Sequence, residues 1–566
     1  MNIRPAKKAL AILLALALAC TVFCAPVTAA EKAPDSGDDY TTVLVHGLLG
    51  WGPEDGLTKV YSGWGLASGK MPDYLRGLGY DIYVATMGPI SSAHDRCCEL
   101  FAQLTGTRVD YGQAHADACN AEYASLGYSL THDRYGRDYT GNPQIQSWGP
   151  IYKDGKATGE FYAGKINLVG HSFGGPTALE FLSLLAEGDE AEIAWAKEQQ
   201  ALYGGDWHDY ISPLFWGDYH GEALIHSVTS LAGVLNGTTF ITSNDDVMPL
   251  MSGLLALLAN LTGDTKISEI YDFQLEQFGL TAIPGTDAET KFSFLSQKGF
   301  LAGKDQAFYD LTTEGTNAMK TGWKTYGSVY YFSYACDKSY KAGGAYMPKA
   351  DIMLLLIPFA MTMGSYKDPN ELALNVDGSV YGGMDAEWMP NDGMVNTISS
   401  RYPLGAPHKE YNVNDISSGI WNVHPDLDDD HFSIIGSFLR PDPIGTRNFF
   451  RSFMEDIART VPVSGEAPVS VGKMQNALDA PVITSAKRAL LTKKPVLDWK
   501  PVSGAFNYQV YRATSEDGDY TLIGTTLLTT YTDFSAPAGT TCFYKLVATP
   551  LAQSKSASPF GLAVKV

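Results

Sequence analysis

The feature of this 566-residue chain that most constrains its fold is an apolar run that ends in a serine flanked by glycines. Residues 165–169 read Lys-Ile-Asn-Leu-Val, and Gly170-His171-Ser172-Phe173-Gly174 follows directly. Apolar residues then recur at helical spacing from Ala178 to Leu185, before Gly188. A buried strand that turns sharply into a helix is typical of the G-x-S-x-G turn, where glycines permit the bend and leave room beside the serine oxygen. The pattern predicts an α/β fold with Ser172 as a nucleophile.

The length of the chain and the changes of composition along it predict more than one domain. Residues 1–30 have the order of a secretory signal peptide: three cations, an apolar stretch shorter than the ~20 residues that span a bilayer, and a small-residue cleavage site. Residues 31–460 are expected to form the catalytic body. Residues 461–479 have the composition of a linker, and residues 480–566 alternate short strand patterns with turn signals, as in a two-sheet β-sandwich.

The charge of the chain agrees with secretion, whereas its cysteines are uninformative on this point. The chain has 41 basic and 62 acidic residues, a net charge of −21 that becomes −24 without residues 1–30, which carry three basic residues and no acidic one. This balance argues against nucleic acid and anionic headgroups as electrostatic partners. The five cysteines after residue 30 have no regular spacing, so they predict no disulfide framework. Anchoring through a lipid is the alternative to release, because Ala17-Leu-Ala-Cys20 is similar to a lipoprotein cleavage box.

A second buried-strand pattern, residues 42–45, ends in His46-Gly47-Leu48. In a hydrolase with the G-x-S-x-G turn, the loop after such a strand supplies one backbone N–H of the oxyanion hole, and the residue after the nucleophile supplies the other. This points to the amides of Leu48 and Phe173. His46 is expected to be a structural loop residue rather than the base, because the base comes late in such a chain.

The expected order of serine, acid and histidine along the chain selects the other two catalytic candidates. Six histidines follow Ser172, and His431 is preceded by three aspartates and followed by apolar residues at helical spacing, which places it where a loop enters a helix. The aspartates also suit a solvated helix start. Asp392 lies in an Asn-Asp-Gly turn between apolar residues, which can hold a carboxylate against a histidine N–H. An Asp-Gly pair is usually only a turn, so Asp392 gains weight from its place between Ser172 and His431.

When further motifs are considered together with these residues, the chain resembles the large zinc-containing bacterial true lipases, which are the thermoalkalophilic bacillus-type enzymes and their staphylococcal relatives. The stretches that carry the resemblance are Val43–Gly52, Gly88–Arg96, Val109–His115, Ser212–Phe215, Ser268–Phe273 and Asn391–Asn396. The resemblance implies an α/β-hydrolase with an inserted zinc subdomain and a lid. It also implies the triad Ser172, Asp392 and His431, and a secreted triacylglycerol lipase whose partner is a lipid or ester substrate at a lipid–water interface.

The same resemblance implies a structural zinc ion held by Asp95, His115, His132 and Asp305. Two carboxylates and two imidazoles can fill a tetrahedral shell. Cys119, four residues after His115, could face the same metal on a helix, although a bystander role is favoured.

Calcium is left in doubt, because the family's two acidic ligands correspond to Ser433 and Phe438 here, with Asp442 as a substitute. The family's Pro-His-Asp-Gly-Thr segment reads Val-Leu-Asn-Gly-Thr at 234–238, a change that the sequence does not explain.

The substrate class depends on weaker signals. Residues 247–261 are a strongly apolar helix candidate, either a buried core helix or a lid, and acidic residues near its start favour the lid. A triacylglycerol lipase is the first interpretation, a carboxylesterase for soluble short-chain esters the second, and a surface-binding protein with an inactive hydrolase body the third. Residues 480–566 contain, in order, Trp499, the motif Tyr508-Gln-Val-Tyr-Arg512, the triplet Tyr531-Thr-Asp533 and the strand pattern Tyr544–Ala548. Through these motifs the segment resembles a fibronectin type III module, which implies a spacer or a domain that binds a surface or polysaccharide.

Overall fold

The computed structural model describes residues 40–566 apart from a set of gaps. These gaps are residues 55, 60–61, 140–147, 154–155, 164, 219–220, 245–270, 282, 284–287, 437–440, 462–469, 472–480, 490–492, 503–504, 516–519, 538–539 and 551–563. The predicted signal peptide, the lid candidate 247–261 and most of the predicted linker lie outside the described residues.

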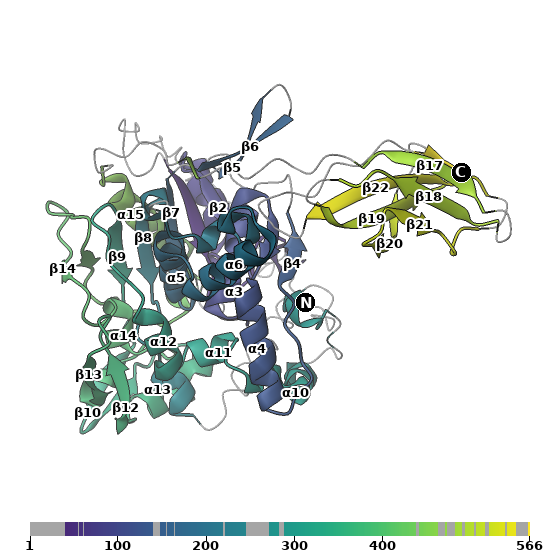
Figure 1. Ribbon diagram of the computed structural model, residues 1–566. Coiled ribbons are helices and arrows are strands. Elements are labelled where there is room, and N and C mark those ends of the chain that lie inside the picture. The colour runs from purple at the N-terminus through teal and green to yellow at the C-terminus, as the bar shows by residue number, and fades with distance from the viewer. Residues whose placement is uncertain are drawn as a thin grey trace, which may run out of the picture.

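A seven-stranded sheet forms the centre of the larger domain (Figure 1). Every neighbouring pair in it is parallel. Its strands, in spatial order, are β14 (His408–Glu410), β15 (Trp421–Val423), β9 (Tyr330–Tyr334), β8 (Ile225–Leu231), β7 (Ile166–His171), β1 (Thr41–Val45) and β2 (Ile82–Val84). Because the strands are parallel, the loops that follow β1, β7, β9 and β15 all leave from the same edge of the sheet, which brings distant segments together.

Alternate side chains of the central strands belong to two separate cores. Val43, Leu168 and Val228 pack with α3 (Ala93–Thr105) and α5 (Gly174–Glu187) on one face. Leu44 and Val169 pack on the other face, in a core that includes residues of α2 (Met71–Gly77) and α15 (Pro443–Ala458). Successive strand side chains point to opposite faces, so the mostly apolar runs at 42–45 and 166–169 follow from burial on both sides. This confirms the predicted α/β class.

The predicted strand-to-helix turn is confirmed, since β7 ends at His171 and α5 begins at Gly174. Gly188 ends α5 with a positive φ of 74°, a conformation that suits glycine. The helix expected directly after His431 is not formed: in the described residues up to Gly436, one short 3₁₀ turn, η11 (Ser433–Ile435), takes its place. Two of its residues, Ile434 and Ile435, are buried, so burial rather than a helix accounts for the apolar spacing.

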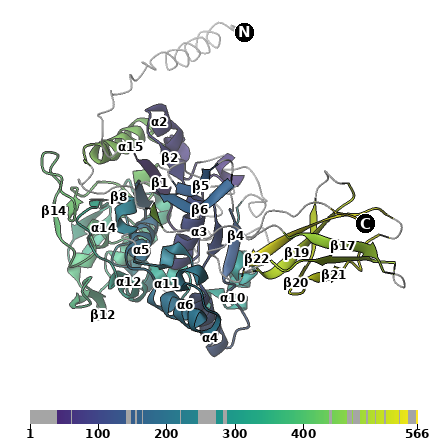
Figure 2. The same cartoon turned by 45° about the horizontal axis from the view of Figure 1, so that its top comes forward.

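Smaller elements surround the sheet (Figure 2). The remaining α-helices are α4 (Gln113–Ser125), α6 (Glu190–Tyr203), α7 (Thr239–Thr242), α10 (Ala288–Lys298), α11 (Ala307–Asp310), α12 (Thr313–Lys320), α13 (Ile357–Met363) and α14 (Thr397–Arg401). The remaining 3₁₀ helices are η2 (Gly56–Lys59), η3 (Leu66–Ser68), η4 (Trp207–Tyr210), η5 (Pro213–Phe215), η6 (Gly221–Leu224), η7 (Glu276–Phe278), η8 (Phe300–Ala302), η9 (Leu354–Leu356) and η10 (Ala386–Trp388).

Four small sheets accompany the central one in the described part of this domain. Antiparallel pairs are formed by β3 (Arg108–Asp110) with β4 (Tyr135–Asp138), β10 (Ser339–Ala342) with β11 (Ala345–Pro348), and β12 (Asp368–Leu374) with β13 (Val380–Met384). A three-stranded sheet combines β5 (Trp148–Lys153), β6 (Lys156–Ala163) and β16 (Ser470–Val471). Residues 470–471 of the predicted linker therefore pair with a hairpin of the larger domain.

The C-terminal segment forms the predicted β-sandwich, drawn in yellow in Figure 1. One sheet has the strands β17 (Ile483–Arg488), β18 (Pro495–Trp499) and β21 (Thr530–Thr532), and the other has β20 (Thr521–Thr526), β19 (Ala505–Ala513), β22 (Phe543–Pro550) and β23 (Val564–Lys565). Leu497, Trp499, Val510 and Leu546 are buried between them. Within the parts of the chain described here, every helix is too short or too polar to span a lipid bilayer.

Candidate active site and metal site

Ser172 occupies a tight bend between β7 and α5. Its φ of +57° lies in the left-handed region, which residues other than glycine rarely adopt. The bend depends on its glycine neighbours: a Cβ on Gly170 would lie 2.2 Å from the Gly174 carbonyl oxygen, and one on Gly174 would lie 2.0 Å from that of Val45. A Cβ on Gly47 would lie 2.7 Å from the Ser172 Cβ. These glycines therefore leave space for the bend and for the approach of the His46–Gly47 loop.

The structure brings the predicted serine, histidine and aspartate into one hydrogen-bonded chain. Ser172 Oγ lies 2.8 Å from His431 Nε2, and His431 Nδ1 lies 2.9 Å from Asp392 Oδ2. The second Asp392 oxygen accepts the N–H groups of Met394 and Val395 at 2.9 and 2.7 Å. A carboxylate at Nδ1 favours the tautomer with its proton on that nitrogen, which leaves Nε2 to accept the serine proton. All three side chains are buried.

The loop that carries His431 is fixed by the side chain before it. Asp430 Oδ1 accepts the Ser433 N–H at 3.0 Å and the Ser433 hydroxyl at 2.9 Å, and Oδ2 accepts the Met353 N–H at 3.0 Å. Asp442 caps α15 by accepting the Gly445 N–H at 2.9 Å. Ser433 and Asp442, two of the positions named for calcium, thus make hydrogen bonds within the chain, and Phe438 lies outside the described residues. Calcium binding stays an untested prediction.

The loop after β1 holds one peptide group in a defined orientation. His46 Nε2 accepts the Met87 N–H at 3.2 Å, so its Nδ1 carries the proton and donates to the Gly47 carbonyl at 2.9 Å. The Gly50 N–H donates to the same carbonyl at 3.0 Å. Because N–H and C=O point in opposite directions across a trans peptide, the Leu48 N–H points away from these donors.

Burial, with a smaller effect of the Arg96 charge, lowers the pKa of His46 to about 3, so the ring stays neutral. Among the described residues, neither the Leu48 N–H nor the Phe173 N–H has a hydrogen-bond acceptor.

Arg96 connects this loop to the helix behind Ser172, a role that the sequence did not indicate. Its side chain is fully buried and donates to the carbonyl oxygens of His46 and Gly88 and to Thr177 Oγ1. The guanidinium carbon also lies 4.9 Å from the centre of the Phe173 ring. A single cation therefore fixes both segments that present the Leu48 and Phe173 amides.

A mostly apolar pocket opens in front of Ser172 and His431. The residues that line it beside the polar triad atoms include Leu48, Leu49, Trp51, Trp64, Leu66, Met394, Phe432 and Ile435. An apolar cavity with a few convergent polar groups is the usual form of a small-molecule site. This lining suits the hydrocarbon part of a substrate.

The four predicted metal ligands form one cluster on the α3 side of the domain. His115 Nε2 lies 3.4 Å from Asp95 Oδ1 and 3.4 Å from Asp305 Oδ1, and His132 Nε2 lies 3.1 Å from Asp95 Oδ2 and 3.5 Å from Asp305 Oδ2. Ligands about 2.0–2.2 Å from one tetrahedral ion lie at about these separations. Two buried carboxylates this close need a cation, and Asp95 Oδ1 and Asp305 Oδ2 have no hydrogen-bond partner among the described residues. The cluster therefore fits a metal ion.

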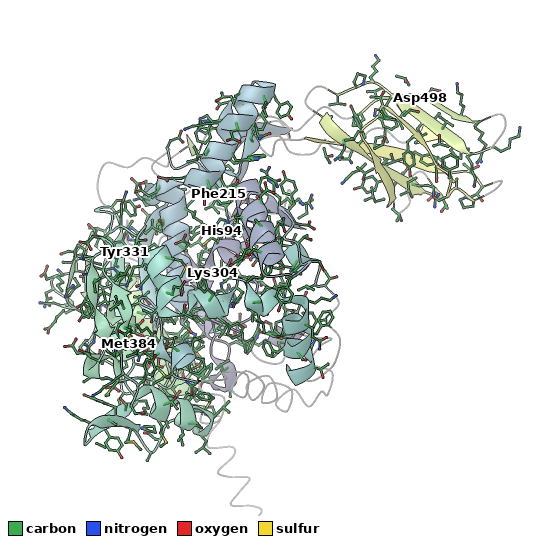
Figure 3. All side chains as sticks on the ribbon, turned by 60° about the horizontal axis from the view of Figure 1, so that its bottom comes forward. His94, Phe215, Lys304, Tyr331, Met384 and Asp498 are labelled. Carbon is green, nitrogen blue, oxygen red and sulfur yellow. The ribbon has the colours of Figure 1, made fainter. Side chains whose placement is uncertain are left out.

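Neighbouring side chains hold these ligands in place. Gln277 Nε2 donates to Asp95 Oδ2 at 2.7 Å, and the Asn120 side chain accepts the His132 N–H at 2.6 Å. His94 stacks on His115 with ring centroids 3.9 Å apart and packs against Phe215 (Figure 3). Gln277, Asn120 and His94 could not be recognised from the sequence, because they meet the ligands only in the folded chain.

Cys119 lies beside this cluster without joining it. Its Sγ is 3.5 Å from His115 Nε2, as the spacing on α4 predicts, but the group of mutually close ligand atoms comprises only Asp95, His115, His132 and Asp305. This agrees with the favoured bystander role.

The departure at 234–238 has a structural explanation at Asn236. Its Oδ1 accepts the Leu404 N–H at 2.8 Å and the ammonium of buried Lys320 at 2.9 Å, while its Nδ2 donates to the Tyr402 carbonyl at 2.8 Å. Burial lowers the pKa of Lys320 to about 7. Asn236 therefore has a structural role, because its hydrogen bonds connect its own loop to Lys320 and to residues 402–404.

Comparison with known proteins identifies the family. The family model for the lipase-like, C-terminal domain matches residues 38–466. Lipase 1 of Staphylococcus aureus (strain NCTC 8325 / PS 47) is 31% identical over 420 residues, which are 74% of this chain and 53% of that protein. This chain thus spans about half the length of the curated relatives it matches.

Solved structures agree with this match. EstA from Clostridium botulinum has a TM-score of 0.59 and 30% identity, and the match covers 78% of this chain and 93% of that one. Lipase 1 from Pelosinus fermentans has a TM-score of 0.58 and 31% identity, and the match covers 75% of this chain and 100% of that one. Staphylococcus hyicus lipase has a TM-score of 0.57 and 25% identity, and the match covers 76% of this chain and 98% of that one. The chain belongs to the family of lipase-like C-terminal domains, an α/β-hydrolase family that includes the staphylococcal lipases.

Proposed function

We propose that this protein is a secreted triacylglycerol lipase that hydrolyses carboxylic esters of fatty acids. The observation that carries the proposal is the continuous hydrogen-bonded chain from Ser172 Oγ through His431 to Asp392, at the wall of an apolar pocket. The family and its members named lipase support the same activity. In this proposal Ser172, Asp392 and His431 are the catalytic residues.

The proposed reaction has two half-reactions. His431 Nε2 takes the Ser172 proton while Oγ attacks the acyl carbon, and then gives that proton to the departing alcohol oxygen. A water molecule, deprotonated by the same nitrogen, releases the fatty acid from Ser172. Asp392 keeps the imidazole in the required tautomer and stabilises its protonated form.

The proposed oxyanion hole consists of the Leu48 and Phe173 backbone amides. Replacing His46 with phenylalanine removes the donor that orients the Gly47–Leu48 peptide, and we expect kcat to fall by about 10²-fold, the lower range for the loss of one oxyanion donor. The measurement is kcat for a soluble p-nitrophenyl ester together with the inhibition constant of a boronic acid that forms a tetrahedral adduct. We expect kcat to fall and the inhibition constant to rise together. An unchanged affinity for the boronic acid would contradict the assignment.

The proposed metal is a structural zinc ion bound by Asp95, His115, His132 and Asp305. Borderline-soft zinc accepts two imidazoles and two carboxylates, and a shell of four protein ligands leaves no position for a reacting water. These residues come from α3, α4, the loop that follows α4 and the segment before α11, so the ion would connect four separate segments of the chain.

A comparison of substrates separates the lipase from a carboxylesterase. We expect the rate on a medium-chain glyceride to rise sharply above its solubility limit, because the pocket wall is apolar and the segment 247–261 is a lid candidate. A saturating rate below that limit, with no rise on the emulsion, would favour the esterase. A fluorophosphonate probe should label Ser172 in either case, and failure to label would favour an inactive hydrolase body.

We further propose that residues 1–30 direct secretion and that the C-terminal sandwich binds a surface or polysaccharide. The acidic net charge supports neither nucleic acid nor anionic headgroups as partners of the whole protein.

A further inference from the structure

His171, the residue directly before Ser172, contacts the backbone of His431. It is the last residue of β7, its side chain is only 4% exposed, and it lines the same pocket as Ser172 and His431. His171 Nε2 lies 2.9 Å from the His431 carbonyl oxygen. A carbonyl oxygen can only accept, so Nε2 carries the proton and donates.

The backbone of His431 is thereby held on both sides, by Asp392 at its N–H and by His171 at its C=O. Its N–H donates to the Asp392 carbonyl at 3.1 Å, and its C=O accepts from the neighbour of Ser172. His431 itself lies outside any helix or strand, so no ladder of backbone hydrogen bonds fixes it. Its position relative to Ser172 depends on such individual contacts and on the turn capped by Asp430.

We propose that His171 is a positioning residue that holds the backbone of His431 so that its Nε2 stays within reach of Ser172 Oγ. The proposal rests on the proposed triad. The two contacts from adjacent residues form a closed frame: Ser172 meets the His431 ring, and His171 meets the His431 main chain.

The surroundings of His171 suit a neutral donor. Burial, and to a smaller extent the neighbouring His431, lower the pKa of His171 well below its usual value. The two imidazole rings have centroids 4.9 Å apart, so a second positive charge there would oppose the protonation of His431 during catalysis. The Trp64 ring packs edge-on against the His171 ring, with ring centroids 6.4 Å apart, and adds apolar surface beside it.

Three variants at this position test the proposal. His171→Phe removes the donor from a site of similar shape, and we expect kcat on a soluble p-nitrophenyl ester to fall by about 10²-fold with KM nearly unchanged, because a displacement of about 1 Å costs that much. His171→Gln carries its amide nitrogen about as far from the backbone as Nε2 and should recover most of the loss. His171→Asn is too short to reach and should resemble the phenylalanine variant; it takes that variant's place if His171→Phe does not fold.

His226→Phe is the matched control. His226 is fully buried on the neighbouring strand β8 and makes one comparable bond, Nε2 to Thr460 Oγ1 at 2.6 Å. The His226→Phe variant should lower the melting temperature about as much as His171→Phe does, while its kcat stays within about twofold of the wild-type value. The proposal is overturned if His171→Phe keeps kcat within about threefold of wild type, if His226→Phe loses as much, or if the glutamine variant is no better than asparagine. An active Ser172→Ala protein would instead refute the proposed triad itself.

Discussion

Replacing Ser172 with alanine is expected to lower kcat for ester hydrolysis by about 10⁵- to 10⁶-fold, the range seen when the nucleophile of such a triad is removed. The attacking oxygen is lost, and no other hydroxyl takes its place beside His431 Nε2 among the described residues. The fold should be unaffected, because alanine removes one oxygen and adds no volume to the crowded bend beside Gly47. The melting temperature and the metal content should equal those of the wild type.

Ser230→Ala is a suitable control for this experiment. Ser230 is fully buried on β8, and its hydroxyl has no hydrogen-bond partner among the described residues. Its loss should leave kcat within about twofold. The initial rate on a p-nitrophenyl ester and labelling by a fluorophosphonate give two independent readouts. More than about 1% residual activity in Ser172→Ala would rule out the proposed nucleophile.

Removing the metal should produce the largest change in stability. An ion present at about 1,000 times its dissociation constant contributes about 4 kcal/mol to the native state, and we expect chelation to lower the melting temperature by roughly 5–10 °C. Without an ion, the carboxylates of Asp95 and Asp305 stay buried beside each other with unpaired oxygens. Differential scanning fluorimetry with and without a chelator measures the shift, and elemental mass spectrometry should find about one zinc per chain.

His132→Ala should reproduce the chelated state and lose its own response to the chelator. Asp133→Ala is the matched control, because this neighbouring side chain is exposed and is not one of the four clustered ligands. It should keep both the zinc and the response. Purified protein that contains no metal, or a melting temperature indifferent to the chelator, would refute the proposed site.

Local patterns in the sequence predicted the parts of the site whose geometry is local. The strand, bend and helix around Ser172 follow from an apolar run, obligatory glycines and helical spacing, and all three are present in the structure. The order of residues along the chain selected Asp392 and His431. The expectation of a helix after His431 was wrong, because Ile434 and Ile435 are buried by tertiary contacts within a single 3₁₀ turn.

The supporting residues could not be predicted in the same way. Arg96, Asn120, Gln277 and His171 contact partners that are between 8 and 260 positions away in the chain, and the residue types alone give no sign of this. Hydrogen bonds of this kind form only when the elements that carry the two partners pack together in the folded chain. The sequence resemblance supplied the four metal ligands, but their spacing in the chain does not show that they meet.

The sequence by itself determined the buried strands, the bend at Ser172 and the helix that follows it, because each depends on neighbours within a few residues. Only the tertiary structure decided that His431 Nε2 lies 2.8 Å from Ser172 Oγ, and that the Gly47–Leu48 peptide is held with its N–H directed away from His46 and Gly50. The physical reason is that hydrogen bonds extend only about 3 Å. Distant segments reach that range only when a parallel sheet brings its loops to one edge and side chains such as Arg96 and His171 hold them there.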